Sequence, residues 1–209
     1  MPQLYLKRKD IKQDFKKLMQ TRHNRDLYQH LIDNSPKYIL AKLGLSILEG
    51  FDLIRVDARE SENTFEIALV SKTEEKVLYY NKVIIVTDIH LNSRPVTQIL
   101  LWRTVDPKYK GLTSGLAEKI FFDYIIETYD IIISENNQTE LGMFFWQTRL
   151  LQAIDKGLFT YLYDYLKGNL LKLNRQILEE LNDKIWGEDD TYQSQLAVIS
   201  KFSFICDLK

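Results

Sequence analysis

The chain has 209 residues, of which 45% are hydrophobic and 27% are charged, and its formal net charge is -1 at pH 7. This length suits one sizeable core, and the near-zero charge gives no general attraction for nucleic acid or for an anionic membrane. The single cysteine, Cys206, excludes an internal disulfide, and no apolar run approaches the roughly 20 residues of a membrane span. We therefore expect a single cytoplasmic domain over residues 1–209. A basic patch at Lys7–Lys17 leaves local nucleic-acid binding open, but we interpret it as a solvated helix face.

Residues 1–50 are predicted to form a helical segment. Apolar residues recur every three or four positions over Ile11–Met19 and again over Leu27–Ile32, with a polar break at residues 22–25 between them. Ser35-Pro36 has the composition of a helix start, because serine caps helices and proline suits the first turn. This predicts a third helix that Gly50 ends.

The middle of the chain is predicted to form strands. Runs rich in Val, Ile, Tyr and Phe are separated by short polar loops, a pattern typical of an antiparallel meander. The runs are Phe51–Val56, Thr64–Val70, Val77–Val86 and Val96–Val105.

Further on, helical and strand patterns alternate. Helical periodicity covers Gly111–Thr128 and Thr139–Lys156, and apolar strands cover Tyr129–Ser134 and Leu158–Tyr165. A strand–helix–strand succession implies a parallel crossover, so the predicted class is α+β: a mixed central sheet, first an antiparallel meander and then a parallel crossover, with flanking helices. The C-terminal extension, residues 166–209, is predicted to contain a helix at Leu170–Trp186 and a strand at Ser194–Ile205.

The junction at Val105–Gly115 carries the best local functional signal. A strand ends there, a turn follows and a helix begins, and helix N-termini attract anions through unpaired N–H groups. Small residues at 111 and 113–115 let a phosphate approach the backbone closely, and Lys108 and Lys110 add positive charge at the rim. The junction predicts a phosphate site; the alternative is an ordinary loop and helix cap.

The same junction resembles motif A of the GNAT acyltransferases, a strand followed by V-x-P-x-x-R-G-x-G-x-G/A and a helix. Val105, Pro107, Lys110, Gly111 and Gly115 match or nearly match it, whereas Thr113 stands where the family usually has glycine. The later segments Gly142–Trp146 and Asp155–Phe159 are similar to the family's motif B, and the stretch from Ser134 to Asp164 is similar to GNAT-like proteins encoded by bacteriophages. The resemblance covers residues 64–165, a GNAT-like core.

The resemblance implies an N-acyltransferase that uses acetyl-CoA or a related acyl-CoA as cosubstrate. In this fold two strands diverge and the pantetheine arm lies between them. An amine acceptor, unknown here, attacks the thioester directly in a ternary complex. The implied cofactor-binding residues are Trp102, Arg103 and Thr104 for pantetheine, Lys110, Gly111, Leu112, Thr113, Ser114 and Gly115 for pyrophosphate, and Asn137.

The catalytic residues follow from the resemblance less directly. Candidates for the general base on the strands are Asp88, His90 and Glu66. Trp146 lies near the position of the family's proton-returning tyrosine, so Tyr163, Tyr161, Asn137 or water is expected to take that role. The three histidines form no metal-ligand pattern, and no metal site is predicted.

Thr113 and Trp146 also favour a second hypothesis. The chain then keeps the GNAT fold but serves as a non-catalytic binding or structural protein, such as a phage factor that acts on a partner in the host cytoplasm. A clear groove between the diverging strands favours the enzyme, and a groove filled by side chains favours the binding protein.

Overall fold

The computed structural model describes residues 15–46, 48–87, 89, 91, 94–134, 140–181 and 194–204. Within these residues the chain forms helices and nine strands, which are mostly antiparallel with one parallel pair, so the predicted α+β class is confirmed. The described residues fall into two compact units. The N-terminal unit takes those of Lys9–Val86 and Ile99–Tyr124, and the C-terminal unit takes those of Thr87–Gln98 and Ile125–Lys209.

The sheet of the N-terminal unit is the predicted meander. Its strands are hydrogen-bonded in the order β1-β2-β3-β4-β5, and β2, β3 and β4 pair antiparallel in chain order. Leu53 of β2 lies opposite Leu69 of β3, which lies opposite Tyr79 of β4. All three side chains are buried, as the alternation of apolar residues predicts. The bounds are Lys37–Tyr38 for β1, Phe51–Asp57 for β2, Thr64–Ser71 for β3, Lys76–Val86 for β4 and Val96–Arg103 for β5.

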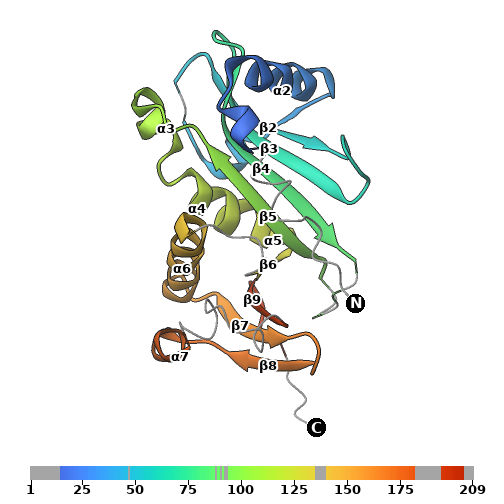
Figure 1. Ribbon diagram of the computed structural model, residues 1–209, viewed down its shortest axis with the longest axis vertical. Helices are drawn as coiled ribbons and strands as arrows, with labels where there is room; N and C mark the ends of the chain where they lie inside the picture. The colour runs from blue at the N-terminus through green and yellow to red at the C-terminus, as the bar shows by residue number, and fades with distance from the viewer. Residues whose placement is uncertain are drawn as a thin grey trace. The chain divides into compact units, whose positions relative to one another are not determined.

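Helix α2, Thr21–Asp33, packs against one face of this sheet (Figure 1). Its Tyr28 and Leu31 are buried in a core cluster with apolar side chains of β2, β3 and β4, and Trp102 of β5 packs against the same cluster. The helix runs through residues 22–25, where the sequence predicted a break. The polar residue Asn24 does not interrupt the helix because its side chain is buried against β4.

The prediction of a third helix after Ser35 is wrong. Ser35 has a φ of 53°, which is not the backbone of a helix cap, and Lys37 and Tyr38 instead pair with Arg55 and Ile54 as the short strand β1. A single 3₁₀ turn, η1 at Ala41–Leu43, follows and buries Leu43. Strand pairing with β2 therefore replaces the helix that the proline signal predicted.

The helix predicted at Gly111–Thr128 forms, but in pieces. Gly115, with a φ of 72°, interrupts it. The pieces are η2 (Pro107–Tyr109), α3 (Lys110–Thr113), α4 (Leu116–Ile120), the π-helical turn η3 (Phe121–Ile125) and α5 (Ile126–Thr128). In η3 the hydroxyl of Tyr124 accepts from Arg55 Nη1 at 3.3 Å, and the Arg55 guanidinium lies 3.8 Å from the ring of Phe65. This segment thus contacts the sheet of the N-terminal unit through Tyr124.

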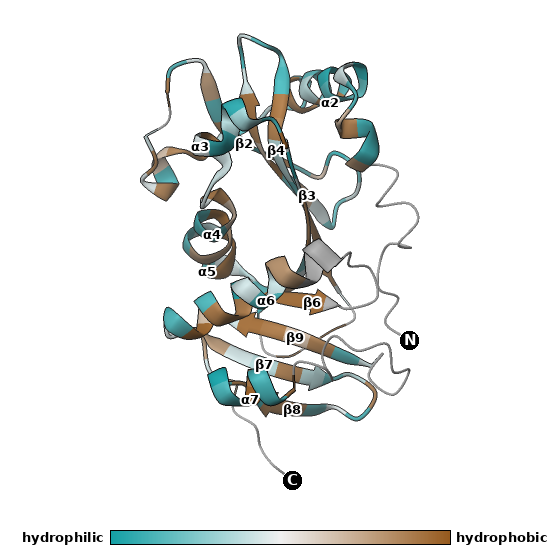
Figure 2. Ribbon diagram, turned by 60° about the vertical axis from the view of Figure 1, so that its left-hand side comes forward, coloured by the Kyte–Doolittle hydropathy of each residue, from teal (hydrophilic) through white to brown (hydrophobic). Residues whose placement is uncertain are grey.

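The C-terminal unit contains the predicted parallel crossover. The first three residues of β5 pair parallel with β6, and β9 lies between β6 and β7, antiparallel to both. Strand β8 pairs with the other side of β7. In Figure 2 β9 is largely apolar, in keeping with the burial of Val198 and Ile199. The bounds are Asp130–Ser134 for β6, Phe159–Asp164 for β7, Asn169–Lys172 for β8 and Gln195–Ser200 for β9.

Helix α6 of this unit, Glu140–Asp155, agrees with the sequence and ends before Gly157, whose φ is 74°. The helix predicted at Leu170–Trp186 is wrong at its start, where Leu170 pairs with Tyr163 in the β7–β8 hairpin. A shorter helix, α7 at Arg175–Glu180, follows, and the side chain of Asn174 caps it by accepting from the Ile177 N–H at 2.8 Å.

Candidate functional site

The loop after β5, residues 104–115, is the candidate site, because it carries the junction that the sequence singled out. Several hydrogen bonds join residues within this loop. The Thr104 hydroxyl accepts from the Asp106 N–H at 3.3 Å, and Asp106 Oδ1 accepts from the Lys108 N–H at 3.0 Å. Pro107 begins η2, where its lack of an N–H is no loss. The loop after β5 is therefore a defined structure rather than a free segment.

Several backbone amides of this loop are already used. The Tyr109 N–H donates to the Asp106 carbonyl at 3.1 Å, and the Ser114 N–H donates to the Lys110 carbonyl at 3.0 Å. The Lys110 N–H donates to the Pro107 carbonyl. With those of Asp106 and Lys108, five amides of the loop thus have partners within it. A phosphate at this place has fewer backbone donors than the sequence implied.

The side chain of Thr113 is likewise engaged. It is 5% exposed, and its hydroxyl donates to the Tyr109 carbonyl at 3.2 Å. The sequence placed this residue where the GNAT family has glycine. Its hydroxyl packs into the loop and adds no donor at the loop surface.

The two glycines of the loop differ in what they require. Gly115 has a φ of 72°, a conformation that side chains with a Cβ rarely adopt. Gly111 has no such restriction, and a Cβ there would meet no heavy atom within 4 Å. Gly115 is therefore required for the turn, whereas Gly111 leaves open space beside the loop.

That open space belongs to a hollow of about 460 Å³, named here the loop hollow. Tyr109 is buried in its floor with its ring 6.4 Å from that of Phe51 in an edge-to-face contact, while Leu48 is mostly exposed. The lining is largely apolar. It consists of Leu48, Phe51, Lys108, Tyr109, Gly111 and Leu112, all in the N-terminal unit.

The two lysines near the loop hollow, Lys108 and Lys110, differ in how readily they can contact an anionic ligand. Lys108 Nζ donates to Glu74 Oε1 at 2.6 Å, and the Tyr109 hydroxyl donates to Glu74 Oε2 at 2.5 Å. The hydrogen bonds from Lys108 and Tyr109 lower the pKa of Glu74, and the bond to Glu74 raises the pKa of Lys108. Lys110 and Ser114, by contrast, are exposed on the loop surface. Lys110 is thus better placed than Lys108 to meet an anion.

Of the strand residues predicted to hold pantetheine, Thr104 donates its N–H to the Leu78 carbonyl of β4 at 2.9 Å. Alternate residues of a strand direct their backbone groups to opposite edges, so Trp102 also faces β4, and Leu101 and Arg103 face away from it. Leu101 was not among the residues that the sequence pointed to. The sequence shows that backbone groups alternate along β5, but the pairing with β4 is needed to tell which residues face away from it.

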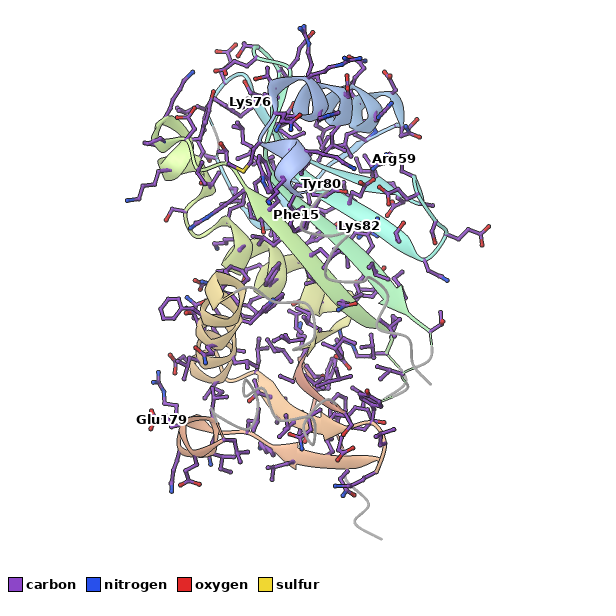
Figure 3. All side chains as sticks on the ribbon, viewed as in Figure 1. Phe15, Arg59, Lys76, Tyr80, Lys82 and Glu179 are labelled. Atoms are coloured by element: carbon purple, nitrogen blue, oxygen red, sulfur yellow. The ribbon has the colours of Figure 1, made fainter. Side chains whose placement is uncertain are left out.

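The proposed base Glu66 is 2% exposed on β3. Its carboxylate accepts from Arg59 Nε and Nη2, both at 2.6 Å, and also from the Tyr80 hydroxyl. Burial, followed by the nearby Glu66 charge, raises the pKa of Tyr80. Arg59, Tyr80 and the neighbouring Lys82 are labelled in Figure 3. Its burial and these three donors make Glu66 a poor base for a substrate amine.

Of the other predicted catalytic residues, Tyr163 and Tyr161 lie in the C-terminal unit. Tyr163 is half-buried on β7, and Tyr161 is buried with its hydroxyl accepting from the Phe204 N–H at 3.0 Å. Trp146, where the family has tyrosine, is 7% exposed on α6. Asp88, His90 and Asn137 lie outside the described residues. Within the described residues no group of three or more His, Cys, Asp or Glu side chains could hold a metal ion.

Glu74 and Phe51 are among the residues of the site that the sequence did not point to. Glu74 lies in the β3–β4 turn and Phe51 at the start of β2, far along the chain from the loop after β5. Neither carries a local signal, because each reaches the loop only through the pairing of β2, β3 and β4.

Comparison with known proteins adds little. No family model matches the sequence, and no curated protein matches it. Among solved structures, the chain is similar to a protein of unknown function from Aquifex aeolicus VF5, with 17% sequence identity and a TM-score of 0.34, over 78% of this chain and 75% of that one. In the part of the chain that the structure describes, no helix is both long and apolar enough to cross a membrane.

Proposed function

We propose that the chain is an acyl-CoA-dependent N-acyltransferase. One observation carries the proposal: among the described residues β5 pairs parallel with β6 over three residue pairs, from Val96↔Asp130 to Gln98↔Ile132, and then runs on to Arg103 and into the loop that lines the loop hollow. The GNAT resemblance expects a strand of this kind, which diverges from its parallel neighbour and is followed by a loop of small residues. The pairing and the loop support the proposal together.

In this proposal the chain binds and orients the acyl-CoA. The backbone groups of Leu101 and Arg103 face away from β4 and hold the amides of the pantetheine arm. The pyrophosphate lies beside Gly111, where no side chain intrudes, with the ammonium of Lys110 as its cationic partner. Positioning of this kind supplies a large part of the rate enhancement in a ternary complex.

The chemical step is direct transfer. The acceptor nitrogen attacks the thioester carbonyl carbon, a C–N bond forms, the C–S bond breaks, and the proton lost by the nitrogen is balanced by one gained by the thiolate. Glu66 is the least suitable of the three proposed bases, since Arg59 and Tyr80 already occupy its oxygens. We therefore assign the base to Asp88 or His90 within the proposal.

Calorimetric titration with acetyl-CoA and with CoA tests the proposal. A Gly111→Asp variant adds a negative charge beside the loop without a steric clash, and Gly111→Ala is its matched control. We expect micromolar binding by the wild type, at least tenfold weaker binding by Gly111→Asp, and little change for Gly111→Ala. An affinity that Gly111→Asp leaves unchanged would remove the ligand from this loop. Absence of binding by folded wild type would overturn the proposal.

The second candidate function is a non-catalytic binding or structural protein. It is favoured by the engagement of the Thr113 hydroxyl and of five loop amides within the loop, which leaves few donors for a phosphate. In that case neither acetyl-CoA nor CoA binds, and partners are sought among proteins and nucleic acids. The titration therefore separates the two candidates.

A further inference from the structure

The carboxylate of Glu74 joins the β3–β4 turn to the loop after β5. Its two oxygens accept from two successive residues of that loop, Lys108 at 2.6 Å and Tyr109 at 2.5 Å. These donors lie 34 and 35 positions further along the chain. A single side chain thus fixes two of the six residues that line the loop hollow.

The Tyr109 ring is held in place by the groups around it. It is 1% exposed, packs edge-on against Phe51, and has the ammonium groups of Lys76 and Lys108 at 5.2 and 5.0 Å from its centre. A buried ring bearing a hydroxyl needs a partner for that hydroxyl, and Glu74 supplies it. Loss of the carboxylate therefore disturbs the floor of the loop hollow as well as its rim.

The ion pair between Glu74 and Lys108 also affects how much positive charge the loop after β5 presents. The ion pair neutralises Lys108, whereas Lys110 is exposed and forms no ion pair with any described residue, so Lys110 is the cation that the loop presents. Without Glu74 both would face an approaching anion. The carboxylate thus limits how strongly the loop attracts anions in general.

We infer that Glu74 is a positioning residue for the loop after β5: it holds Lys108 and Tyr109 in the shape that the ligand meets, and it keeps Lys108 from acting as a second anion-binding charge. Its effect on acyl-CoA rests on the proposed function, whereas its effect on the loop does not.

Glu74→Gln tests the inference, with Glu75→Gln as the matched control. Glu75 is the next residue and pairs with Arg25 at an exposed position away from the loop. A third variant, Tyr109→Phe, removes the other hydrogen bond and keeps the ring. Backbone amide exchange is followed by NMR at Tyr109 and Lys110, whose N–H groups bond within the loop. We expect exchange there to speed up about three- to tenfold in Glu74→Gln and Tyr109→Phe, and not in Glu75→Gln.

CoA binding supplies a readout that loosening of the loop alone does not move. Glu74→Gln releases the Lys108 ammonium, so the dependence of CoA affinity on salt becomes steeper, whereas Tyr109→Phe leaves it unchanged. At high salt, where that charge is screened, Glu74→Gln is expected to bind about three- to tenfold more weakly than the wild type.

The outcomes are distinct. Unchanged exchange at Tyr109 and Lys110 in Glu74→Gln overturns the inference. If amide exchange in Glu74→Gln is faster but the salt dependence of its CoA affinity is unchanged, Glu74 holds the loop but does not restrain the charge of Lys108. If the wild type fails to bind CoA, the proposed function falls, and the exchange measurement alone decides whether Glu74 holds the loop.

Discussion

The side-chain amide of Asn24 pairs with the backbone of Val77 much as a neighbouring strand would. Its Oδ1 accepts from the Val77 N–H at 2.8 Å, and its Nδ2 donates to the Val77 carbonyl at 3.0 Å and to the Leu18 carbonyl at 3.1 Å. Val77 lies where the register of β3 and β4 shifts between Leu69 and Val70. One helix residue thus satisfies backbone groups at an irregular point of the sheet.

Replacement of Asn24 by alanine is expected to destabilise the N-terminal unit by about 2–3 kcal/mol, because it leaves the buried N–H and carbonyl of Val77 unsatisfied. Urea unfolding followed by circular dichroism measures the change. The control is Asn34→Ala, which removes an exposed bond to the His30 carbonyl and is expected to cost less than about 1 kcal/mol. Equal losses in the two variants would contradict a special role for Asn24.

Arg59→Leu is expected to cost about 2–3 kcal/mol, since it leaves the buried carboxylate of Glu66 without its main partner while Arg59 itself is partly exposed. Arg25→Leu is the control, because it breaks the exposed ion pair with Glu75 and is expected to cost under about 1 kcal/mol. Chemical unfolding of both variants is the measurement. A small loss for Arg59→Leu would show that Glu66 finds other partners or takes up a proton.

Asp130 predicts a pH dependence in the C-terminal unit. Burial raises its pKa above the ordinary value of 3.8, while Ser200 and Arg94 partly oppose the rise, and Arg94 Nε lies 3.7 Å from its carboxylate. A group whose pKa is raised on folding stabilises the fold most below its unfolded pKa, and this contribution is lost as pH rises through the folded pKa. Relative to Asp130→Asn, the wild type is therefore expected to lose stability from about pH 4 upward.

Unfolding free energies of the two proteins, measured at several pH values, check this sign. Asp155→Asn, at an exposed position that pairs with Arg175, serves as the control. A wild type that gains stability over Asp130→Asn as pH rises would mean that Arg94 outweighs the burial of the carboxylate.

The two loop glycines should respond oppositely to alanine. Gly115→Ala places a Cβ at a φ of 72° and is expected to destabilise the fold by about 1 kcal/mol. Gly111→Ala lies in α3 with open space around it and is expected to be neutral or to stabilise by up to about 1 kcal/mol. Thermal unfolding of the pair measures the difference. A destabilising Gly111→Ala would mean that the loop needs the freedom of glycine at both positions.

Local patterns predicted the strands of the meander well. Phe51–Val56, Thr64–Val70 and Val77–Val86 each agree with a strand of the structure within one or two residues at either end. Such strands alternate apolar and polar residues or form apolar runs, and short polar turns join them, so both features are visible in the sequence. The parallel pairing of β5 with β6 also follows from the intervening helix.

The helix errors share one cause. The Ser35-Pro36 signal predicted one helix and a second was predicted from Leu170, yet pairing with β2 and with β7 makes strands of Lys37–Tyr38 and Asn169–Lys172. At residues 22–25 the error is of the opposite kind. Polar residues predicted a break, but the helix continues because the polar side chain of Asn24 is buried. Tertiary contacts override local preference when a neighbouring strand edge is available.

The division into two units also had no signal in the sequence. Two of its boundaries fall inside β5 and inside the helical stretch from Leu116 to Thr128, where no linker is present, and another falls at the end of β4. The single-domain prediction stays a prediction, as do the GNAT family, the acyl-CoA cosubstrate and the catalytic residues.

The sequence by itself determined the α+β class, the strands of the meander, the parallel crossover and the loop of small residues at 111–115, because each follows from neighbours within a few positions. Only the tertiary structure decided that Asn24 bonds to Val77, that β9 lies between β6 and β7, and that Glu74 holds Lys108 and Tyr109. These contacts join residues 30 or more positions apart, and no local periodicity encodes which distant partner a side chain will meet.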